Sequence, residues 1–273
     1  MKLSKDTMTI STNILKEWYN IASSLYRFDC NAILNAKDEP AYFKKFIPDV
    51  VNYLNSLKLL DRRLSFICSS KEVHKTPIVK FDKDSPPPGC ELADYFIVVE
   101  YRHNGHPLGR KVIFYQFKIS KKGPKWDLKQ KQLTLLKDWP KFTCGGGKNP
   151  PEFSIKPTKP EFGSYWLGDK YNKNSLFLTA YDVACLKNKN SIKVDNPFRY
   201  CLFSAPISLL MLIAWRIGED ILPQSDIEKL VTLLLSKSGN VPSSAGAFKG
   251  NSFTLNNRGN VPFALEICVN YEG

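Results

Sequence analysis

The sequence predicts an α/β fold in which helices pack on a sheet that has an antiparallel strand pair at its centre. Two long runs of strand-forming apolar residues, about 91–101 and 111–120, lie on either side of Asn104-Gly105. This dipeptide favours a tight hairpin turn. Before and after the hairpin, apolar residues recur every three or four positions, which is the period of an amphipathic helix. Helices and strands combined in this way predict an α/β architecture.

The remaining elements follow from the same periodicities and from their caps and breakers. Pro48 lies within the second predicted helix and indicates a break or restart there. Pro140 ends the helix after the hairpin. In chain order we expect a helix capped at Ser11 or Thr12, a helix over about 39–60, strands near 64–69 and 78–81, the hairpin, a helix over 127–139, a strand over 175–180, helices near 206–220 and 226–236, and a closing strand over 263–271.

Composition divides the chain into three parts. Residues 1–140 hold the predicted helices and hairpin, and residues 141–170 are rich in Gly, Pro and Lys. Such a stretch is typical of a long loop or a boundary. Residues 171–273 then form a C-terminal α/β elaboration that we expect to pack on the first part.

The overall composition indicates a folded and strongly basic protein. Hydrophobic residues make up 43% of the chain, enough to bury a core. The formal net charge of +13 attracts polyanions, nucleic acid first and an anionic membrane surface second. Seven scattered cysteines without a CxxC pair, and an N-terminus without the apolar stretch of a secretory signal, predict free thiols and a cytoplasmic location.

Polar residues inside the predicted hairpin are the strongest functional signal. Side chains two apart share a face of a strand, so Gln116 and Lys118 point the same way, and strand pairing is expected to place Asp94 beside Gln116. Glu91 lies just before. Carboxylate and amide oxygens are suitable ligands for Mg²⁺, and the Lys118 ammonium can neutralise charge that develops on a phosphate. These groups suit metal-dependent phosphodiester hydrolysis.

This arrangement resembles the PD-(D/E)xK superfamily, the restriction-endonuclease-like nucleases. In that family an acid is followed, after about the length of a hairpin, by a (D/E)-x-K motif in an apolar strand. Glu91-Leu-Ala-Asp94 and Ile113-Phe-Tyr-Gln116-Phe-Lys118 carry the resemblance, which covers about 91–139. It implies a central mixed sheet flanked by helices, and cleavage of DNA or, less often, RNA with Mg²⁺, for which Mn²⁺ can substitute. It also implies a bacterial restriction or anti-phage defence effector, alone, as a homo-oligomer or with partner subunits.

The sequence departs from the family pattern at two positions. Gln116 stands where the family usually has Asp or Glu, as in its Q-x-K variants, and Ala93 stands where the proline precedes the first acid. The missing negative charge weakens metal binding unless another acid restores it. Glu91, or Glu17 on the first helix, is the expected source of that charge.

Basic residues surround the predicted site. From Arg102 to Lys131 there are nine Lys or Arg and one acid, Asp127. Ammonium groups contact phosphates without reading bases, so they predict salt-sensitive binding that is largely independent of sequence. The segment Lys156-Pro-Thr-Lys-Pro160 is linker-like and can also contact phosphate. The residues expected to bind nucleic acid are Arg110, Lys121, Lys122, Lys125 and Lys129.

Three alternatives stay open. In the first alternative, Asp94, Gln116 and Lys118 are ordinary solvent-facing positions of a half-buried strand. Against this, the face that Gln116 and Lys118 share begins with apolar residues, which a purely solvated face would not do. In the second, the protein keeps the nuclease core with a degraded site and binds nucleic acid or partner proteins without cutting. The third, a membrane-surface protein, requires an amphipathic basic helix, whereas the basic run here lies mainly on strands and a turn. No membrane association is therefore expected.

Overall fold

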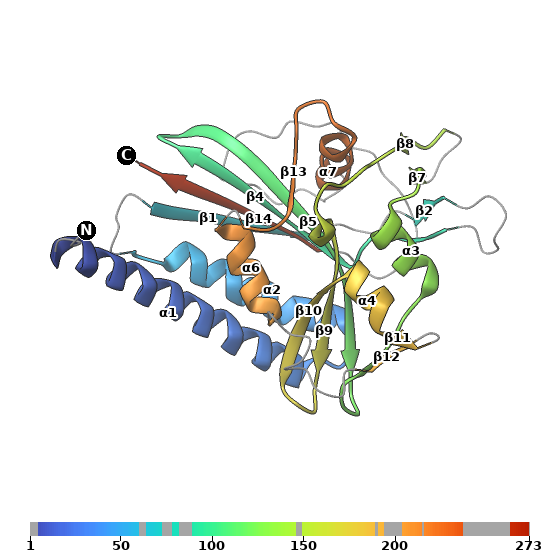
Figure 1. Ribbon diagram of the computed structural model, residues 1–273, viewed down its shortest axis with the longest axis horizontal. Coiled ribbons are helices and arrows are strands. Elements are labelled where there is room, and N and C mark those ends of the chain that lie inside the picture. Colours follow the sequence, from blue (N-terminus) through green and yellow to red (C-terminus); the bar gives the residue numbers. More distant parts are fainter. Residues whose placement is uncertain are drawn as a thin grey trace.

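The computed structural model describes residues 5–59, 64–72, 78–81, 89–145, 149–188, 191–193, 204–214, 216–236 and 263–272. Within these ranges the chain is a mixed α/β protein with a central mixed sheet of seven strands and six helices (Figure 1). The proline-rich segment that precedes the hairpin, Pro86-Pro-Pro-Gly89, predicts a turn and falls mostly outside the described residues. So does Trp215, the last residue of the apolar run that predicted a helix near 206–220.

The central sheet is built around the predicted hairpin. β4 and β5 pair antiparallel, and Asn104 and Gly105 make the turn between them with positive φ angles of 48° and 78°. Parallel strands then extend the sheet on both sides, because β14 pairs with β4 and β9 pairs with β5. The strand order is β1-β14-β4-β5-β9-β10, with β13 on β5. The bounds are β1 Leu64–Glu72, β4 Tyr95–His103, β5 His106–Ser120, β9 Gly163–Asp169, β10 Asn174–Thr179, β13 Glu219–Asp220 and β14 Phe263–Tyr271.

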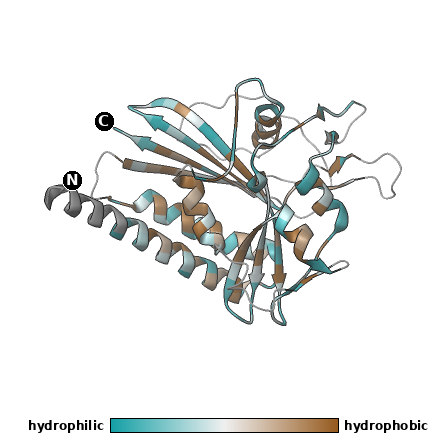
Figure 2. Cartoon of the chain, in the orientation of Figure 1, coloured by the Kyte–Doolittle hydropathy of each residue, from teal (hydrophilic) through white to brown (hydrophobic). Residues whose placement is uncertain are grey.

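Helices cover both faces of this sheet, because each strand alternates apolar side chains between two cores. Tyr115 and Phe117 of β5 face the core that holds α1, α2 and α6, whereas Val112 and Phe114 face the core that holds α3, α4 and α7. Figure 2 shows apolar residues on the sides of the helices that meet the sheet. The bounds are α1 Lys5–Asn35, α2 Glu39–Ser56, α3 Gln130–Asp138, α4 Ala180–Leu186, α6 Ala205–Ile213 and α7 Asp226–Ser236.

Two small sheets and a short helical turn complete the described fold. The first small sheet has the order β3-β2-β7-β8 and the second has the order β11-β12-β6. Their bounds, with those of the 3₁₀ helix η1, are β2 Ile78–Lys80, β3 Cys90–Glu91, β6 Lys125–Asp127, β7 Phe142–Cys144, β8 Glu152–Phe153, η1 Pro160–Phe162, β11 Lys187–Asn188 and β12 Ser191–Lys193.

Several expected elements differ from those observed. α2 passes through Pro48 without a break, because Phe46, Ile47 and Val50 are buried against the sheet and fix the helix on both sides of the proline. α1 is longer than its apolar pattern indicated. The stretch 141–170, expected as a loop, contains β7, β8 and β9, and β9 is a fully buried strand of the central sheet. By contrast, α7 and β14 have the expected bounds.

Candidate functional site

Asp94 and Gln116 meet at the point where β4 begins. The backbone N–H of Asp94 donates to the carbonyl of Tyr115 at 2.9 Å, which fixes the acid beside the middle of β5. Its carboxylate accepts a hydrogen bond from the Gln116 side-chain amide and another, at 2.8 Å, from the N–H of Phe117. Strand pairing therefore brings the first acid of the motif onto the Q-x-K segment, as the sequence predicted.

Lys118 completes this cluster. Its ammonium lies 3.7 Å from Asp94 Oδ2 and 3.2 Å from Glu39 Oε1, so it bridges two carboxylates. The side chains of Lys118 and Asp94 are only 13% and 15% exposed. Coulomb attraction at such short range is strong where water is largely excluded. The three groups form a compact ionic cluster that is largely shielded from solvent.

Glu39 was not among the residues predicted to form the site. It is the first residue of α2, and Asp38 caps that helix by accepting the N–H of Ala41 at 2.8 Å. The cap fixes where the helix starts, and with it the position of Glu39 in the first turn. An acid in the first helical turn is the available sequence signal, but it does not reveal which strand the helix end meets.

Glu17, expected as the accessory acid, does not join this cluster. It lines a separate pocket with Lys16, Asn20 and Tyr53, next to the C-terminal end of α2. Glu39 stands at the other end of the same helix, about 20 Å away at 1.5 Å per residue. The helix carboxylate that meets Lys118 is therefore Glu39 of α2, and not Glu17 of α1.

Glu91 lies at the edge of the site. Gln132 on α3 donates its side-chain amide to Glu91 at 3.4 Å, and the Lys129 ammonium is 4.0 Å from the same carboxylate. The charge of Glu91 also raises the pKa of Asp94, although less than burial does. Glu91 thus contributes negative charge to the site but touches a different set of side chains.

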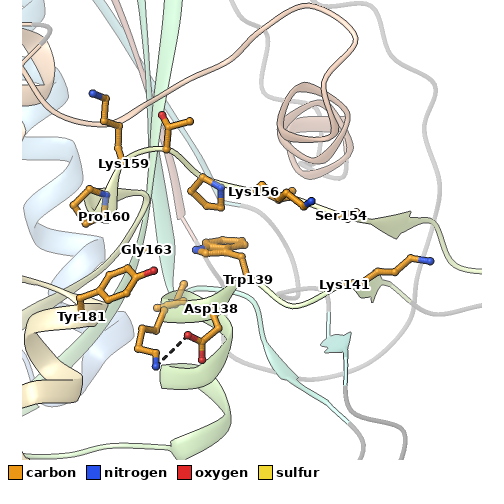
Figure 3. A pocket seen from close by; sticks show the side chains of 14 residues that line it. Asp138, Trp139, Lys141, Ser154, Lys156, Lys159, Pro160, Gly163 and Tyr181 are labelled. Atoms are coloured by element: carbon orange, nitrogen blue, oxygen red, sulfur yellow. Dashed lines mark ion pairs between the residues drawn. The ribbon is translucent and has the colours of Figure 1, made fainter.

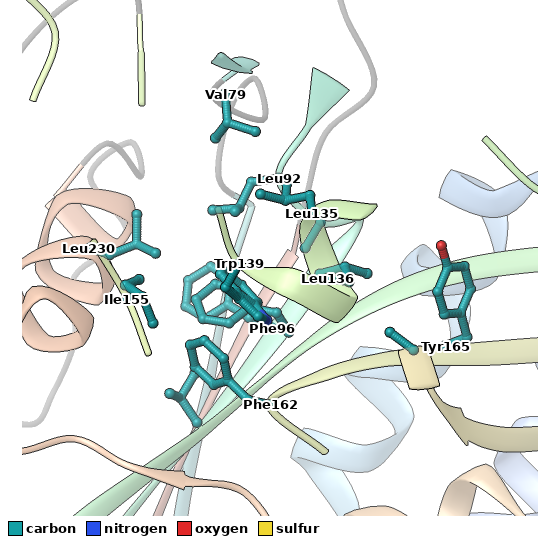
Figure 4. Packing of buried hydrophobic residues seen from close by; sticks show 14 of the residues in the cluster. Val79, Leu92, Phe96, Leu135, Leu136, Trp139, Ile155, Phe162, Tyr165 and Leu230 are labelled. Carbon is teal, nitrogen blue, oxygen red and sulfur yellow. The ribbon is translucent and has the colours of Figure 1, made fainter. Parts of the chain in front are cut away.

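Three buried polar atoms around Asp94 lack a hydrogen-bond partner within the described part of the chain. They are Oε1 of Gln116, Oε1 of Gln132 and the hydroxyl of Tyr165. Tyr165 is the register partner of Gln116 on β9, and its ring stands apart from the aromatic group around Trp139 (Figure 4). Buried polar groups are usually satisfied. Three unsatisfied ones near a carboxylate indicate a place where a ligand completes the hydrogen bonding.

Burial changes the proton affinity of the site. Desolvation raises the pKa of Asp94 to about 7, against the opposing effect of the Lys118 charge. For Lys118, desolvation lowers the pKa, but the charges of Asp94 and Glu39 outweigh it, so that the net pKa is raised. Lys118 is therefore held as an ammonium. Shifts of this kind in a recessed charged cluster are common at functional sites.

The donor set fits Mg²⁺ better than a transition metal, because it consists of carboxylate and amide oxygens. No group of three or more His, Cys, Asp or Glu side chains close enough to hold a metal occurs among the described residues. Asp94, Glu39 and the unpartnered Gln116 oxygen are thus the oxygens on offer, and an ion held by so few protein ligands has to keep several waters.

The predicted phosphate contacts separate into two groups. Lys121, Lys122 and Lys125 are exposed just beyond the end of β5, and Lys129 is exposed beside Glu91. Arg110 does not belong with them: it lies six residues before Gln116, about 20 Å along the strand, and its guanidinium is 4.0 Å from Glu228 on α7.

Trp126 of β6 is buried, and its indole N–H donates to the carbonyl of Gly168 at 2.8 Å. The six cysteines in the described ranges are free thiols. Within the same ranges, no helix combines the length and apolar character that crossing a membrane requires.

Compared with known proteins, the chain matches no protein-family model, no curated protein and no solved structure.

Proposed function

We propose that this protein is a metal-dependent nuclease that hydrolyses phosphodiester bonds of DNA, with RNA as the second candidate substrate. The observation that carries the proposal is the bridging position of Lys118 between Asp94 and Glu39, together with the buried Gln116, which donates to Asp94 and whose side-chain oxygen has no partner among the described residues. An ammonium, two carboxylates and an amide in one cluster are groups that suit this chemistry.

Each side chain has a distinct role in the proposal. Asp94, Glu39 and Gln116 would hold Mg²⁺, or Mn²⁺ in its place, with Glu91 adding negative charge nearby. A divalent ion bound there would supply Lewis-acid polarisation of a phosphoryl oxygen and a coordinated water of lowered pKa. Lys118 neutralises negative charge on the reacting phosphate. The exposed lysines after β5 bind neighbouring phosphates without reading bases.

The resemblance of the motif to Q-x-K nucleases supports a role as a bacterial restriction or anti-phage defence effector, in the cytoplasm, as a homo-oligomer or with partner subunits. The second candidate function is nucleic-acid binding or assembly without cleavage. One observation favours this alternative: Gln116 supplies no negative charge, so the negative charge that the cluster offers a metal comes from two carboxylates that are already paired with Lys118.

A cleavage assay separates the two functions. Purified protein is incubated with plasmid, single-stranded DNA and RNA in Mg²⁺, Mn²⁺ or EDTA. We expect cleavage that EDTA abolishes. Lys118→Met keeps the length of the buried stem but removes the charge, and it should lower the rate by at least about 100-fold. Lys44→Gln, an exposed lysine on α2, is the matched control. Binding without EDTA-sensitive cleavage would support the non-catalytic alternative.

A further inference from the structure

A recess lies at the C-terminal end of α3, separate from the Asp94 cluster. It has a volume of about 610 Å³, within the usual range for small-molecule sites. Trp139, Lys141, Lys156, Lys159, Pro160 and Tyr181 are among the residues that line it (Figure 3). The segment 156–160, which the sequence marked as linker-like and able to contact phosphate, forms one wall.

That wall is held in place by a buried carboxylate. Glu219 on β13 accepts the backbone N–H of Thr158 and of Lys159, each at 2.8 Å, and the Thr158 hydroxyl at 3.0 Å. β13 is itself paired with β5 of the central sheet. Farther along the wall, the N–H of Ser154 donates to Asp226 of α7 at 2.9 Å. The recess is therefore pre-formed by anchored backbone.

The charge around the recess is strongly positive. Its lining includes four lysines and one acid, Asp138. Lys137 pairs with Asp138 at 3.0 Å and Lys141 with Glu152 at 2.8 Å. Lys156 and Lys159 are exposed and have no acidic partner within the described part of the chain. Their flexible stems allow both ammonium groups to turn onto an anion at the rim.

The rest of the lining is apolar or aromatic. Tyr181 is 51% exposed, and its hydroxyl end points across the recess in the direction of Trp139 (Figure 3). Pro157 and Pro160 add flat apolar surface. The indole N–H of Trp139 is buried and has no acceptor among the described residues. Aromatic faces and prolines beside lysines favour a ligand with a flat ring and a phosphate.

We propose that this recess binds a nucleotide, either free or as one unit of a nucleic-acid strand. Lys156 and Lys159 hold the phosphate, and the base stacks on Tyr181. Gln132 and Trp139 lie at opposite ends of α3, about 10 Å apart along the helix, so that the Asp94 cluster and this recess are distinct sites that share one helix. The nucleotide site does not depend on the nuclease proposal.

Binding measured in EDTA tests the site without the chemistry of the Asp94 cluster. The probes are ATP, inorganic phosphate and a short 5′-phosphorylated oligonucleotide, each titrated into the full chain by calorimetry. Binding of ATP supports a free nucleotide as the ligand. Binding of the oligonucleotide alone, weakened in Lys156→Gln/Lys159→Gln, supports a strand unit.

Variants decide whether the recess is responsible. Lys156→Gln/Lys159→Gln should weaken binding about tenfold or more, because a single hydrogen bond to a charged group contributes about a factor of ten to affinity. Tyr181→Ala should weaken ATP more than inorganic phosphate. The charge-matched control is Lys44→Gln/Lys45→Gln on α2, which packs in the opposite core. The proposal is overturned if Lys156→Gln/Lys159→Gln binds ATP and the oligonucleotide as tightly as the Lys44→Gln/Lys45→Gln control does. It is also overturned if inorganic phosphate binds as tightly as ATP.

Discussion

Two buried aspartates show how the same physics serves stability in one place and a site in another. Burial raises the pKa of Asp29 to about 6 and that of Asp94 to about 7. Asp29 on α1 is satisfied, because Tyr42 donates to it at 2.7 Å and Ser175 at 2.6 Å. Asp94 instead lies beside polar atoms that lack partners. We assign Asp29 to stability and Asp94 to function.

Asp29 should make stability fall as pH rises through mild acid. The folded state holds this proton more tightly than the unfolded state, so its contribution is fully present below pH 3.8 and is lost as pH rises to about 6. The shift corresponds to about 3 kcal/mol. Asp29→Asn has no such proton. We expect urea unfolding to show that, as pH rises from 4 to 7, the variant gains stability relative to wild type. Parallel curves of unfolding free energy against pH would contradict this.

Gln116→Glu tests whether position 116 is a metal ligand. A second carboxylate against Asp94 in a buried recess should cost on the order of 2 kcal/mol without metal, because like charges repel there. Mg²⁺ should restore that loss, and thermal unfolding with and without the ion measures it. The control is Gln130→Glu on the exposed start of α3. A variant that is equally unstable in Mg²⁺ and EDTA would remove position 116 from the metal site.

At the scale of the element, α3 matters most, because its two ends serve the two proposed sites. Gly163, where β9 begins, lets the strand approach this helix closely. A Cβ at Gly163 would lie 2.1 Å from the carbonyl oxygen of Leu136, far inside any van der Waals contact. The glycine is thus required by space, and it fixes the position of α3 against the sheet.

Gly163→Ala should therefore force α3 away from β9. We expect a loss of about 3 kcal/mol in the free energy of unfolding, as for other overpacked cores. Gly123→Ala is the control: its added Cβ meets open space, and only the strain of its positive φ remains, about 1 kcal/mol. Urea denaturation measures both. A smaller loss in Gly163→Ala than in Gly123→Ala would show that the helix adjusts without cost.

At the scale of the whole molecule, the charge of +13 is spread over distinct surfaces. Lys121, Lys122 and Lys125 follow the end of β5, which carries Lys118. A strand bound at the proposed active site would meet these lysines first. The recess at the end of α3 holds a second group of lysines, and Arg110 belongs to neither because it lies near Glu228.

Binding of duplex DNA should depend steeply on salt. Each phosphate contact contributes about 0.9 to the slope of log affinity against log salt. Lys121→Gln/Lys122→Gln/Lys125→Gln should reduce that slope by about 2 to 3, and Lys44→Gln/Lys45→Gln should leave it unchanged. Fluorescence anisotropy in EDTA from 50 to 300 mM salt, a range of about sixfold, measures both. Equal slopes would place the DNA elsewhere on the molecule.

Local patterns predicted the elements whose stability is local. The Asn104-Gly105 turn joined β4 to β5, and a register shift at Tyr101/Arg102 set the pairing beyond it. The meeting of Asp94, Gln116 and Lys118 depends on both. β9 was missed because Gly163 and Gly168 and the prolines before them read as loop, although the strand is stabilised by burial between β5 and β10. The break expected at Pro48 does not occur, because the packing of the helix outweighs the loss of the backbone hydrogen bond that proline cannot donate.

The amino-acid sequence by itself determined the α/β class, the central hairpin and the polar triad at its core, because turn chemistry and side-chain alternation act over a few neighbouring residues. Only the tertiary structure decided that Glu39 and not Glu17 joins Lys118, that Gln132 of α3 meets Glu91, and that the 156–160 segment walls a cavity. These depend on which helix end and which strand meet after long-range packing, and no local period encodes that.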